Sequence, residues 1–322
     1  MKFLLRLLGV FAGVALHAGE VAADYPTRPI RMVVPYAPGG ASDIFARMVA
    51  EKFTAAWAQQ VVVDNRVGAG GNIGSDIVAK ANPDGYTMLL GTSGSNAVNP
   101  SLYTRMPYDA KRDLALVALV ASTPNIIVVR SAHPAKSVRD LIQMAKTNPG
   151  KVTYGSAGVG SVLHLSGELL KTVMGINIVH VPYKGTGPSL IDLLGGQIDM
   201  VFSNLPPVVP YVQDGRMRGI AVTTAERARP LPNVPTMIEG GVPNYDVASW
   251  FGVMLPSKTP PAVMEKINRE VQRILKLPDT KERLTTMGAD PMFMSAQEAN
   301  RFFHSEIAKW AKVVKASGAK AD

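Results

Sequence analysis

The sequence predicts an α/β protein made of two lobes, and the order of its apolar segments is the main reason. Short strand-like runs alternate with segments of helical spacing from residue 30 to about residue 121, and the alternation begins again after Pro124. The chain has 322 residues, of which 47% are hydrophobic, so it can fill two cores of ordinary size. We therefore expect two α/β lobes, each with its own sheet.

The first half predicts a mainly parallel sheet with helices on its faces. The expected strands are residues 30–34, 61–63 and 86–90. One helix is expected to begin at Ser42, where Ser42 or Asp43 can cap it, and another to cover residues 71–81. The apolar run 114–121 carries no helical charge pattern and is followed by Pro124.

The second half repeats the pattern and then changes to helices. Its expected strands are residues 125–129, 152–154, 178–181, 198–202, 220–223 and 249–255. Its expected helices are residues 138–147, 163–170, 189–194, 262–275, 281–286 and 297–314. Because the last three helices have no strands between them, we expect them to pack on the first sheet. This assigns residues 24–122 and 249–322 to lobe 1 and residues 123–248 to lobe 2, with two crossings at 114–124 and 248–255.

Residues 1–23 are predicted to be a secretory signal peptide. They begin with the basic residues Lys2 and Arg6, continue with an apolar stretch at 7–16 and end in small residues at 21–23. This apolar stretch is shorter than the ~20 residues that cross a bilayer, which favours a cleavable leader over an uncleaved anchor. We expect a soluble mature protein, beginning at about Asp24, in the periplasm.

Composition excludes several classes of function. The chain has no cysteine, so it forms no disulfide, no thiolate metal site and no cysteine nucleophile. Its formal net charge is +9, but the basic residues are spread along the chain and are not interleaved with aromatic residues. We expect no nucleic-acid partner and only a weak general attraction for anions.

Four turns of similar composition connect a strand to a helix. Glycine, serine and threonine are concentrated in residues 35–43, 91–96, 155–161 and 183–189. A helix that begins in such a turn leaves its first amide groups unpaired, and these groups with the positive end of the helix dipole favour an anion. A single turn of this kind is also explained by the positive φ that tight turns need. Because the pattern occurs four times, we interpret the turns as an anion-binding site.

Several longer motifs occur in a fixed order. They are YPTRPI at 25–30, PYAPGG at 35–40 with Asp43, VDNR at 63–66, GAGGN at 68–72, PDGYT at 83–87, NPSLY at 99–103, YGSAG at 154–158, HVPYKG at 180–185 and GQID at 196–199. In these motifs, from about residue 25 almost to the carboxyl terminus, the chain resembles the substrate-binding proteins of tripartite tricarboxylate transporters, often called Bug proteins.

This resemblance implies a type II periplasmic binding protein fold, with two α/β lobes joined by two crossing strands and a ligand cleft between them. It implies a small organic carboxylate as ligand, held by backbone amides, hydroxyls and ordered waters. Dicarboxylates, tricarboxylates, acidic amino acids and aromatic acids all stay open. It further implies delivery of the ligand to the membrane permease of a tripartite tricarboxylate transporter, with presentation to a sensor kinase as the alternative. We expect a monomer.

The candidates for ligand binding come from the turns and from a strand that follows them. In lobe 1 they are Tyr36, Ala37, Gly40, Ser42, Ser93 and Asn96. In lobe 2 they are Ser156, Ala157, Gly158, Ser161, His164, Lys184, Gly185, Thr186, Asp199 and Ser203. Three of these have an equally simple structural role: His164 fits a core hydrogen bond, Lys184 fits a solvated surface, and Asp199 fits a carboxylate that ties a turn.

An enzyme is the rival class. Residues 91–95 read GTSGS, in which Ser95 replaces the last glycine of the G-x-S-x-G nucleophile elbow. Residues 68–74 read GAGGNIG, in which Ile73 occupies the place of the third glycine of G-x-G-x-x-G. The sequence also has no H-E-x-x-H and no P-loop lysine motif. It therefore predicts no enzyme, no cofactor and no metal, with a secreted hydrolase as the remaining enzymatic alternative.

Overall fold

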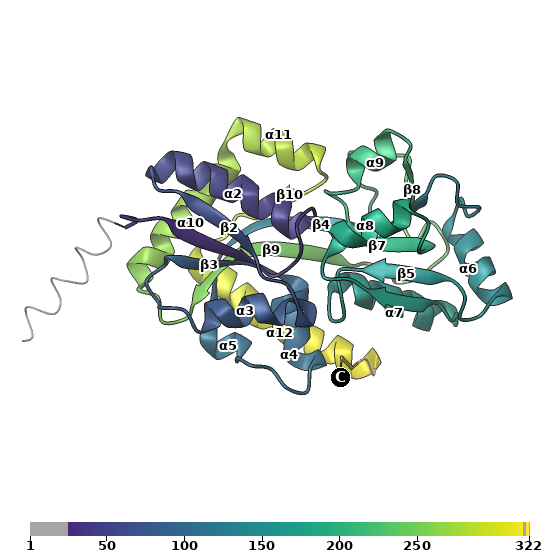
Figure 1. The fold of residues 1–322 in the computed structure, drawn as a ribbon, viewed down its shortest axis with the longest axis horizontal. Helices are drawn as coiled ribbons and strands as arrows, with labels where there is room; N and C mark the ends of the chain where they lie inside the picture. The colour runs from purple at the N-terminus through teal and green to yellow at the C-terminus, as the bar shows by residue number, and fades with distance from the viewer. Residues whose placement is uncertain (1–24, 318–319, 322) are drawn as a thin grey trace, which may run out of the picture.

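The strands of the molecule form two sheets that share one long strand, β4 (Leu114–Arg130) (Figure 1). The structure is a computed structural model and describes residues 25–317 and 320–321. The predicted signal peptide at residues 1–23 lies outside the described residues. The two sheets with their helices are the two lobes, and the expected α/β class is confirmed.

The sheet of the first lobe has a parallel part and an antiparallel part. Its strands are β2 (Val61–Asn65), β1 (Ile30–Val34), β3 (Thr87–Thr92), β9 (Ala248–Pro256), the first part of β4 and β10 (Asp290–Pro291). The strand β1 pairs in parallel with β2 and β3, whereas β9 runs antiparallel to both β3 and β4. The sheet is therefore less parallel than expected, because its central strands are the ones that cross between the lobes.

The second lobe is built on the last part of β4. Its other strands are β7 (Met200–Asn204), β5 (Thr153–Ser156), β6 (Val179–Pro182) and β8 (Met217–Val222). The strands β7, β5 and β6 are parallel to one another, and both β7 and β8 are antiparallel to β4. The connection between the lobes thus consists of β4 and of β9, which pair from Leu114 and Pro256 to Pro124 and Ala248.

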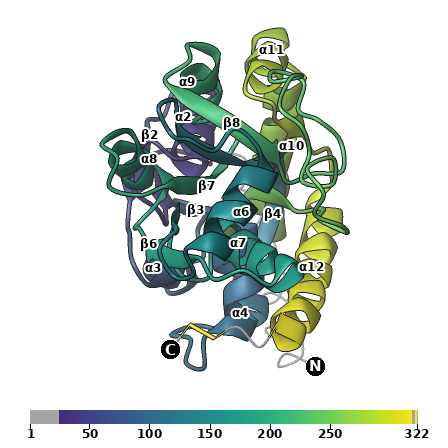
Figure 2. The same ribbon diagram turned by 90° about the vertical axis from the view of Figure 1, so that its right-hand side faces the viewer.

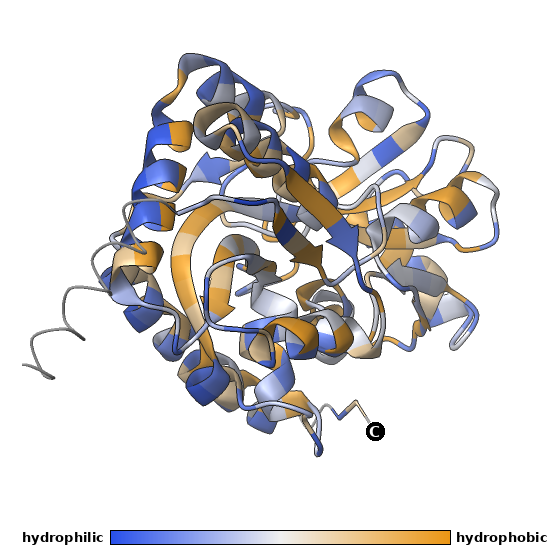
Figure 3. Ribbon diagram, turned by 60° about the vertical axis from the view of Figure 1, so that its left-hand side comes forward, coloured by the Kyte–Doolittle hydropathy of each residue, from blue (hydrophilic) through white to orange (hydrophobic). Residues whose placement is uncertain are grey.

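Helices cover both faces of the first sheet. One face carries α2 (Ala41–Trp57), α10 (Pro261–Lys276) and α11 (Pro278–Thr286), and the other carries α3 (Asn72–Ala79), α4 (Asn99–Leu102), α5 (Ala110–Asp113) and α12 (Ala296–Ser317). Successive residues of β1 alternate between the two faces of this sheet. Met32 and Val34 pack in the core under α2, α10 and α11, and Val33 packs in the core under α3, α4, α5 and α12. Figure 3 shows these strands as apolar along their length and the surface helices as two-sided.

The second sheet is covered in the same way. Its helices are α6 (Val138–Thr147), α7 (Val162–Met174), α8 (Thr186–Leu194) and α9 (Val209–Gln213). Helices α7 and α8 lie on opposite sides of β7 and β5 (Figure 2). Within the described residues, no helix is both long and apolar enough to cross a membrane.

The short elements α4, α5, α9 and β10 were not expected, and two further elements differ from the sequence-based expectation. Residues 114–130 form one strand in place of an apolar run and a separate strand, because Pro124 lies where β4 passes from the first sheet to the second. Residues Ser93–Val98 form a π-helix, where only a turn was expected.

Candidate functional site

A small cavity lies between the two lobes, with a volume of about 30 Å³. From the first lobe and the crossing strand β9 it is lined by Tyr36, Gly40, Ala41, Ser42, Thr92, Ser93, Gly94, Ser249 and Phe251. From the second lobe it is lined by Ala157, Ser161, Val162, Leu163, Thr186 and Asn204. None of these lining residues carries a formal charge, so a ligand here meets only amide groups, hydroxyls and apolar side chains.

The amino terminus of α2 lies at this cavity without a side-chain cap. Its N-cap residue is Gly40, and no side chain bonds to the first-turn amides. The predicted cap by Ser42 or Asp43 is therefore wrong, because the helix begins at Ala41 and both residues lie within its first turn. The carboxylate of Asp43 instead accepts from the Gly39 amide, Arg47 and Asn65, which leaves the α2 dipole directed at the cavity.

The amino terminus of α8 faces the same cavity from the other lobe. Its N-cap residue is Gly185, again with no side-chain cap, and its first residue is Thr186. The two helix ends are close together: a Cβ built on Gly40 would lie 3.6 Å from both the Cβ and the amide nitrogen of Thr186. Two uncapped helix amino termini, one from each lobe, thus converge on one cavity, which is the arrangement that favours an anion.

Hydroxyl groups accompany the two helix ends. Ser42 and Thr186 are both buried and line the cavity, and their hydroxyls form no hydrogen bond with another residue of the part of the chain that the structure describes. Each hydroxyl can donate one hydrogen bond to a ligand. They are therefore the side-chain donors best placed to hold a carboxylate together with the helix amides.

The turn after β3 is closed by its own side chains. Thr92 accepts from the Ser95 amide, and the side-chain oxygen of Asn96 accepts from the Thr92 amide and from the Ser95 hydroxyl. Asn96 also donates to Ser75 at 3.2 Å and is fully buried. Asn96 thus shapes the π-helical turn that presents Ser93 and Gly94 to the cavity.

Tyr36 closes one side of the cavity as a neutral phenol. Burial raises the pKa of Tyr36 to about 12, although hydrogen bonds with Thr92 and Ser95 act in the opposite direction. Its hydroxyl donates to the carbonyl oxygen of Gly70 at 3.1 Å. The phenol is uncharged at neutral pH, so it does not repel a bound carboxylate.

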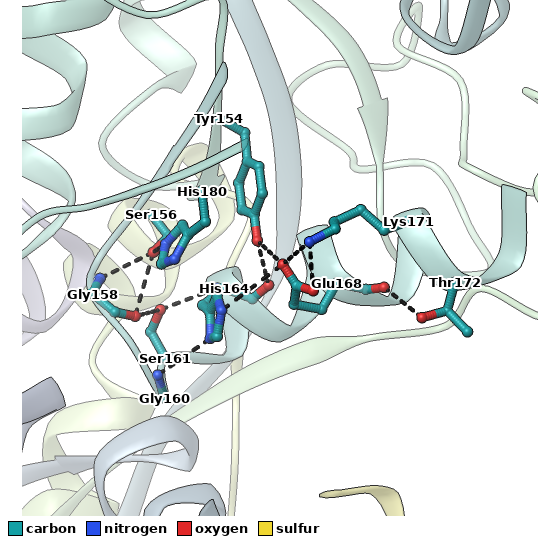
Figure 4. A network of polar contacts seen from close by, with 10 residues as sticks. All are labelled: Tyr154, Ser156, Gly158, Gly160, Ser161, His164, Glu168, Lys171, Thr172 and His180. Atoms are coloured by element: carbon teal, nitrogen blue, oxygen red, sulfur yellow. Dashed lines mark hydrogen bonds and ion pairs between the residues drawn. The ribbon is translucent and has the colours of Figure 1, made fainter. Parts of the chain in front are cut away.

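The glycine-rich turn after β5 is held by a network inside the second lobe (Figure 4). Ser161 is the N-cap of α7: its hydroxyl accepts from the His164 amide and donates to the Gly158 carbonyl at 2.7 Å. The Ser156 hydroxyl accepts from the Gly158 amide and lies 2.7 Å from Nε2 of His180. These hydroxyls are occupied within the turn, so Ser156 and Ser161 fix its shape.

Two histidines, His164 and His180, pack beside this turn. The rings of His164 and His180 stack with centroids 4.2 Å apart. Figure 4 shows both residues beside the turn. Burial lowers the pKa of both rings, and for His180, where His164 and Lys171 add to the effect, the value is about 3. Both rings are therefore neutral at physiological pH. Their role here is structural, because they pack together beside the turn.

Polar side chains from β7 and from the crossing strands β4 and β9 form the floor of the cavity. Asn125 of β4 accepts at its side-chain oxygen from Nδ2 of Asn204 and from the hydroxyl of Ser249, each at 2.8 Å. Asn125 is fully buried, whereas Asn204 and Ser249 line the cavity. A ligand on this floor would thus touch β7 of the second lobe and the crossing strand β9, while Asn125 of β4 holds both lining side chains from behind.

The structure brings about half of the sequence-predicted residues to the cavity. Those that line it are Tyr36, Gly40, Ser42, Ser93, Ala157, Ser161 and Thr186. Those that do not line it are Ala37, Asn96, Ser156, Gly158, His164, Lys184, Gly185, Asp199 and Ser203.

Most residues of the second group support the turns. A Cβ on Gly158 would lie 2.7 Å from the Tyr183 carbonyl oxygen, so the close approach at this glycine is to a neighbouring turn. Asp199 accepts from the amide and hydroxyl of Thr153 at the start of the neighbouring strand β5, so it joins two strands and does not tie a turn as expected. Lys184 has an exposed side chain. The hydroxyl of Ser203 donates to the Asn204 carbonyl, and Ser203 is fully buried outside the cavity lining.

Several lining residues were not among the predicted ones. They are Ala41, Thr92, Gly94, Val162, Leu163, Asn204, Ser249 and Phe251. For Asn204 the sequence does contain a signal. Ser203 and Asn204 are the last two residues of β7, and side chains of successive strand residues point to opposite faces, so only one of the two is expected to face the cavity. Ser249 lies in the strand and crossing expected at residues 248–255, but the sequence does not show which side chains of that strand face the cavity.

Known proteins resemble this chain over nearly its whole length. Residues 45–319 match the family described as "Tripartite tricarboxylate transporter family receptor". Protein BugT of Bordetella pertussis is 38% identical over 322 residues, with 99% of each chain covered. Rpa4515 of R. palustris, solved with adipate, is 41% identical with a TM-score of 0.88, covering 92% of this chain and 100% of that one. MatC of Rhodopseudomonas palustris, solved with bound malate, is 30% identical with a TM-score of 0.86, covering 90% of this chain and 100% of that one.

Proposed function

Because the chain belongs to the tripartite tricarboxylate transporter family of receptors, we propose that it captures a small organic carboxylate in the cavity between its lobes. It then delivers this ligand to the membrane permease of such a transporter. The expected periplasmic binding protein fold is confirmed by the solved periplasmic binding protein BugD, which matches at a TM-score of 0.88.

One observation carries the proposal: the uncapped amino termini of α2 and α8 converge on the cavity from opposite lobes. Each helix end favours a negative group by about 0.3–1 kcal/mol when exposed and more when partly buried. The hydroxyls of Ser42 and Thr186 add donors at the same place. A carboxylate there would interact with both lobes at once and would therefore stabilise the closed state over an open one.

The ligand class agrees with the solved relatives. Adipate and malate, the compounds named with those structures, are both small carboxylic acids. The cavity of this chain has no cationic lining residue, so the carboxylate would be neutralised by amides and hydroxyls. This arrangement also lacks a general base beside a nucleophile in the lining, and we propose binding without catalysis.

The first test is a thermal-shift and calorimetric screen of ligand-stripped protein. The panel contains malate, adipate, citrate, aspartate, glutamate, benzoate and, as neutral controls, uncharged sugars. Binding to the native state alone raises the melting temperature by mass action. We expect a shift with one class of carboxylate and none with the sugars; a panel in which only neutral solutes bind would contradict the proposal.

Variants then locate the site. Thr186→Val keeps the shape and removes the hydroxyl, so the affinity for the best carboxylate should fall about five- to tenfold, as for the loss of one hydrogen bond. Ser203→Ala is the matched control, because its hydroxyl is fully buried outside the cavity. It should change stability and leave affinity unchanged. Equal affinities in wild type and Thr186→Val would remove Thr186 from the site.

The cellular assignment is part of the same proposal. We propose that residues 1–23 are a leader, that the mature protein is a periplasmic monomer, and that its lobes are residues 24–122 with 249–322 and residues 123–248. Loss of carboxylate uptake on deletion, with co-purification of a membrane permease, supports delivery. Co-purification with a sensor kinase and normal uptake would support ligand presentation instead.

A further inference from the structure

The two lobes meet along a line of backbone that lies beside the cavity. On the first lobe this line is residues 37–40, before α2, and on the second it is residues 184–187, at the start of α8; we call it the seam. The amide of Ala37 donates to the carbonyl oxygen of Lys184 at 2.8 Å, so the seam contains a direct hydrogen bond between the lobes. The seam therefore exists only when the lobes are closed.

Glycines allow the backbones to come this close. Gly39 and Gly187 face each other, with a Cβ on Gly39 3.7 Å from the Cα of Gly187. A Cβ on Gly187 would lie 2.2 Å from the carbonyl oxygen of Pro38, which is far inside van der Waals contact. Its next neighbours, at 3.3 and 3.5 Å, are the carbonyl carbons of Pro38 and Gly39.

Gly187 differs from Gly39 and Gly185 in its backbone conformation, and from Gly40 in its contacts, because a Cβ on Gly40 would meet nothing closer than 3.6 Å. Gly39 and Gly185 have φ of +83° and +146°, so any side chain there strains the turn itself. Gly187 lies within α8 and has no positive φ. All three near contacts of its absent Cβ are with backbone of the opposite lobe.

We propose that Gly187 is a positioning residue for ligand capture, because its missing side chain lets the seam close and any Cβ at this position holds the lobes apart. It lies outside the cavity lining, so it acts on the closing equilibrium and not on the contacts with the ligand. The consequence for affinity rests on the proposed function, whereas the consequence for closure does not. A ligand that binds the closed state is held less tightly when that state is less populated.

The test uses full-length mature protein with Gly187→Ala. Gly195→Ala is the matched control, since Gly195 ends the same helix, has φ of −73° and would meet its nearest neighbour at 3.5 Å. Pro188 follows Gly187 and disfavours the helical conformation of a preceding residue that has a Cβ. Each variant is therefore also made in a Pro188→Ala background, where that local effect is absent.

A cross-link measures closure without any ligand. The chain has no cysteine, and a Cβ at Gly40 would lie 3.6 Å from that of Thr186, within the usual disulfide range of about 3.5–4.5 Å. Gly40→Cys with Thr186→Cys should therefore form a disulfide on mild oxidation whenever the lobes close. We expect Gly187→Ala to slow this reaction about tenfold or more in both backgrounds, and Gly195→Ala to leave it unchanged.

Affinity is measured separately, with adipate and malate as probes and without the cysteines. The dissociation constant of the probe that the wild type binds should rise about tenfold or more in Gly187→Ala. The unfolding midpoint of the ligand-free Gly187→Ala protein should equal that of the Gly195→Ala control. Unchanged cross-linking in Gly187→Ala, or no cross-link in the parent pair, would overturn the role of Gly187. Slowed cross-linking in a protein that binds no carboxylate would support the seam and contradict the proposed function.

Discussion

Asp43 is a buried carboxylate beside the cavity that is fully neutralised by its neighbours. It accepts from Nε of Arg47 and Nδ2 of Asn65 at 3.1 Å each, and from the Gly39 amide at 3.2 Å. Burial alone would raise the pKa of Asp43, but the hydrogen bonds from Arg47, Gly39 and Asn65 hold that pKa below its usual value. Because it binds the Gly39 amide, this carboxylate ties the turn before α2 to its helix.

Replacing Asp43 should give a pH-dependent loss of stability. The folded pKa is lowered, so the carboxylate stabilises the fold fully above its unfolded pKa of about 3.9, and this contribution is lost as the pH falls through the folded pKa. Asp43→Asn should lower the free energy of unfolding by about 1–3 kcal/mol at pH 7. Urea unfolding at pH 7, 5, 4 and 3 measures the gap from wild type, which should narrow below about pH 4.

The control for this prediction is Glu282→Gln, which changes an exposed carboxylate on α11 and should have no effect of this size. A gap between wild type and Asp43→Asn that stays constant down to pH 3 would show that the carboxylate charge is not what stabilises the turn.

At the scale of residues, sequence patterns located the turns better than the contacts within them. Ser42, a predicted ligand-binding residue, lines the cavity, although it was expected at the helix start and the helix begins at Gly40 and Ala41. Ser156 and Ser161 have the same composition signal as Ser42, yet their hydroxyls bind their own turn. Which hydroxyl is occupied depends on φ and ψ within the turn, and a glycine-rich sequence leaves these angles open.

Helix α12 is fastened to the crossing strand β9 by one acidic residue. Glu306 of α12 is buried, and its Oε2 accepts from the indole nitrogens of Trp250 on β9 and Trp310 on α12, each at 3.1 Å. Its Oε1 accepts from Lys309 at 3.1 Å, whose side chain is mostly exposed. Trp250 also donates its backbone amide to Ser93, so this attachment reaches the wall of the cavity.

Glu306→Ala should therefore destabilise the protein strongly. It leaves two buried indole N–H groups without an acceptor, at a cost of about 2–4 kcal/mol in the free energy of unfolding. Lys309→Ala is the matched control, since it removes only the ion pair of Glu306 with an exposed lysine. It should lower the free energy of unfolding by less than about 1 kcal/mol. Urea unfolding followed by tryptophan fluorescence measures both. Equal losses in the two variants would mean that the indole bonds contribute little.

At the scale of elements, the order of strands and helices was predictable and their irregular parts were not. The helix Val138–Thr147 agrees with the expected range, because a serine cap and apolar spacing both mark it locally. The π-helix Ser93–Val98 depends on Asn96 reaching back to the Thr92 amide and across to Ser75, a contact that spacing does not reveal. The same holds for β4, whose continuity through Pro124 depends on pairing with β9.

The molecule as a whole is closed, and apolar contacts cross between its lobes. Val162 and Leu165 of α7 pack in the same core cluster as Leu102 and Trp250 of the first lobe and its crossing strand. The lobes are thus in contact at this cluster as well as at the seam and at the two helix ends. Opening the cleft would expose part of this cluster to water, so closure is favoured by apolar burial as well as by the ligand.

The size of the protein in solution should therefore report ligand capture. A compact chain of this length has a radius of gyration of about 19 Å, and the carboxylate-bound protein should lie near this value in small-angle X-ray scattering. The ligand-free protein should be larger, because without an anion the dipoles of α2 and α8 face each other at their positive ends across the cavity. An uncharged sugar serves as the control and should leave the radius unchanged. Equal radii with and without a carboxylate that calorimetry shows to be bound would mean that the lobes are already closed before the ligand arrives, and that the ligand enters through a transient opening.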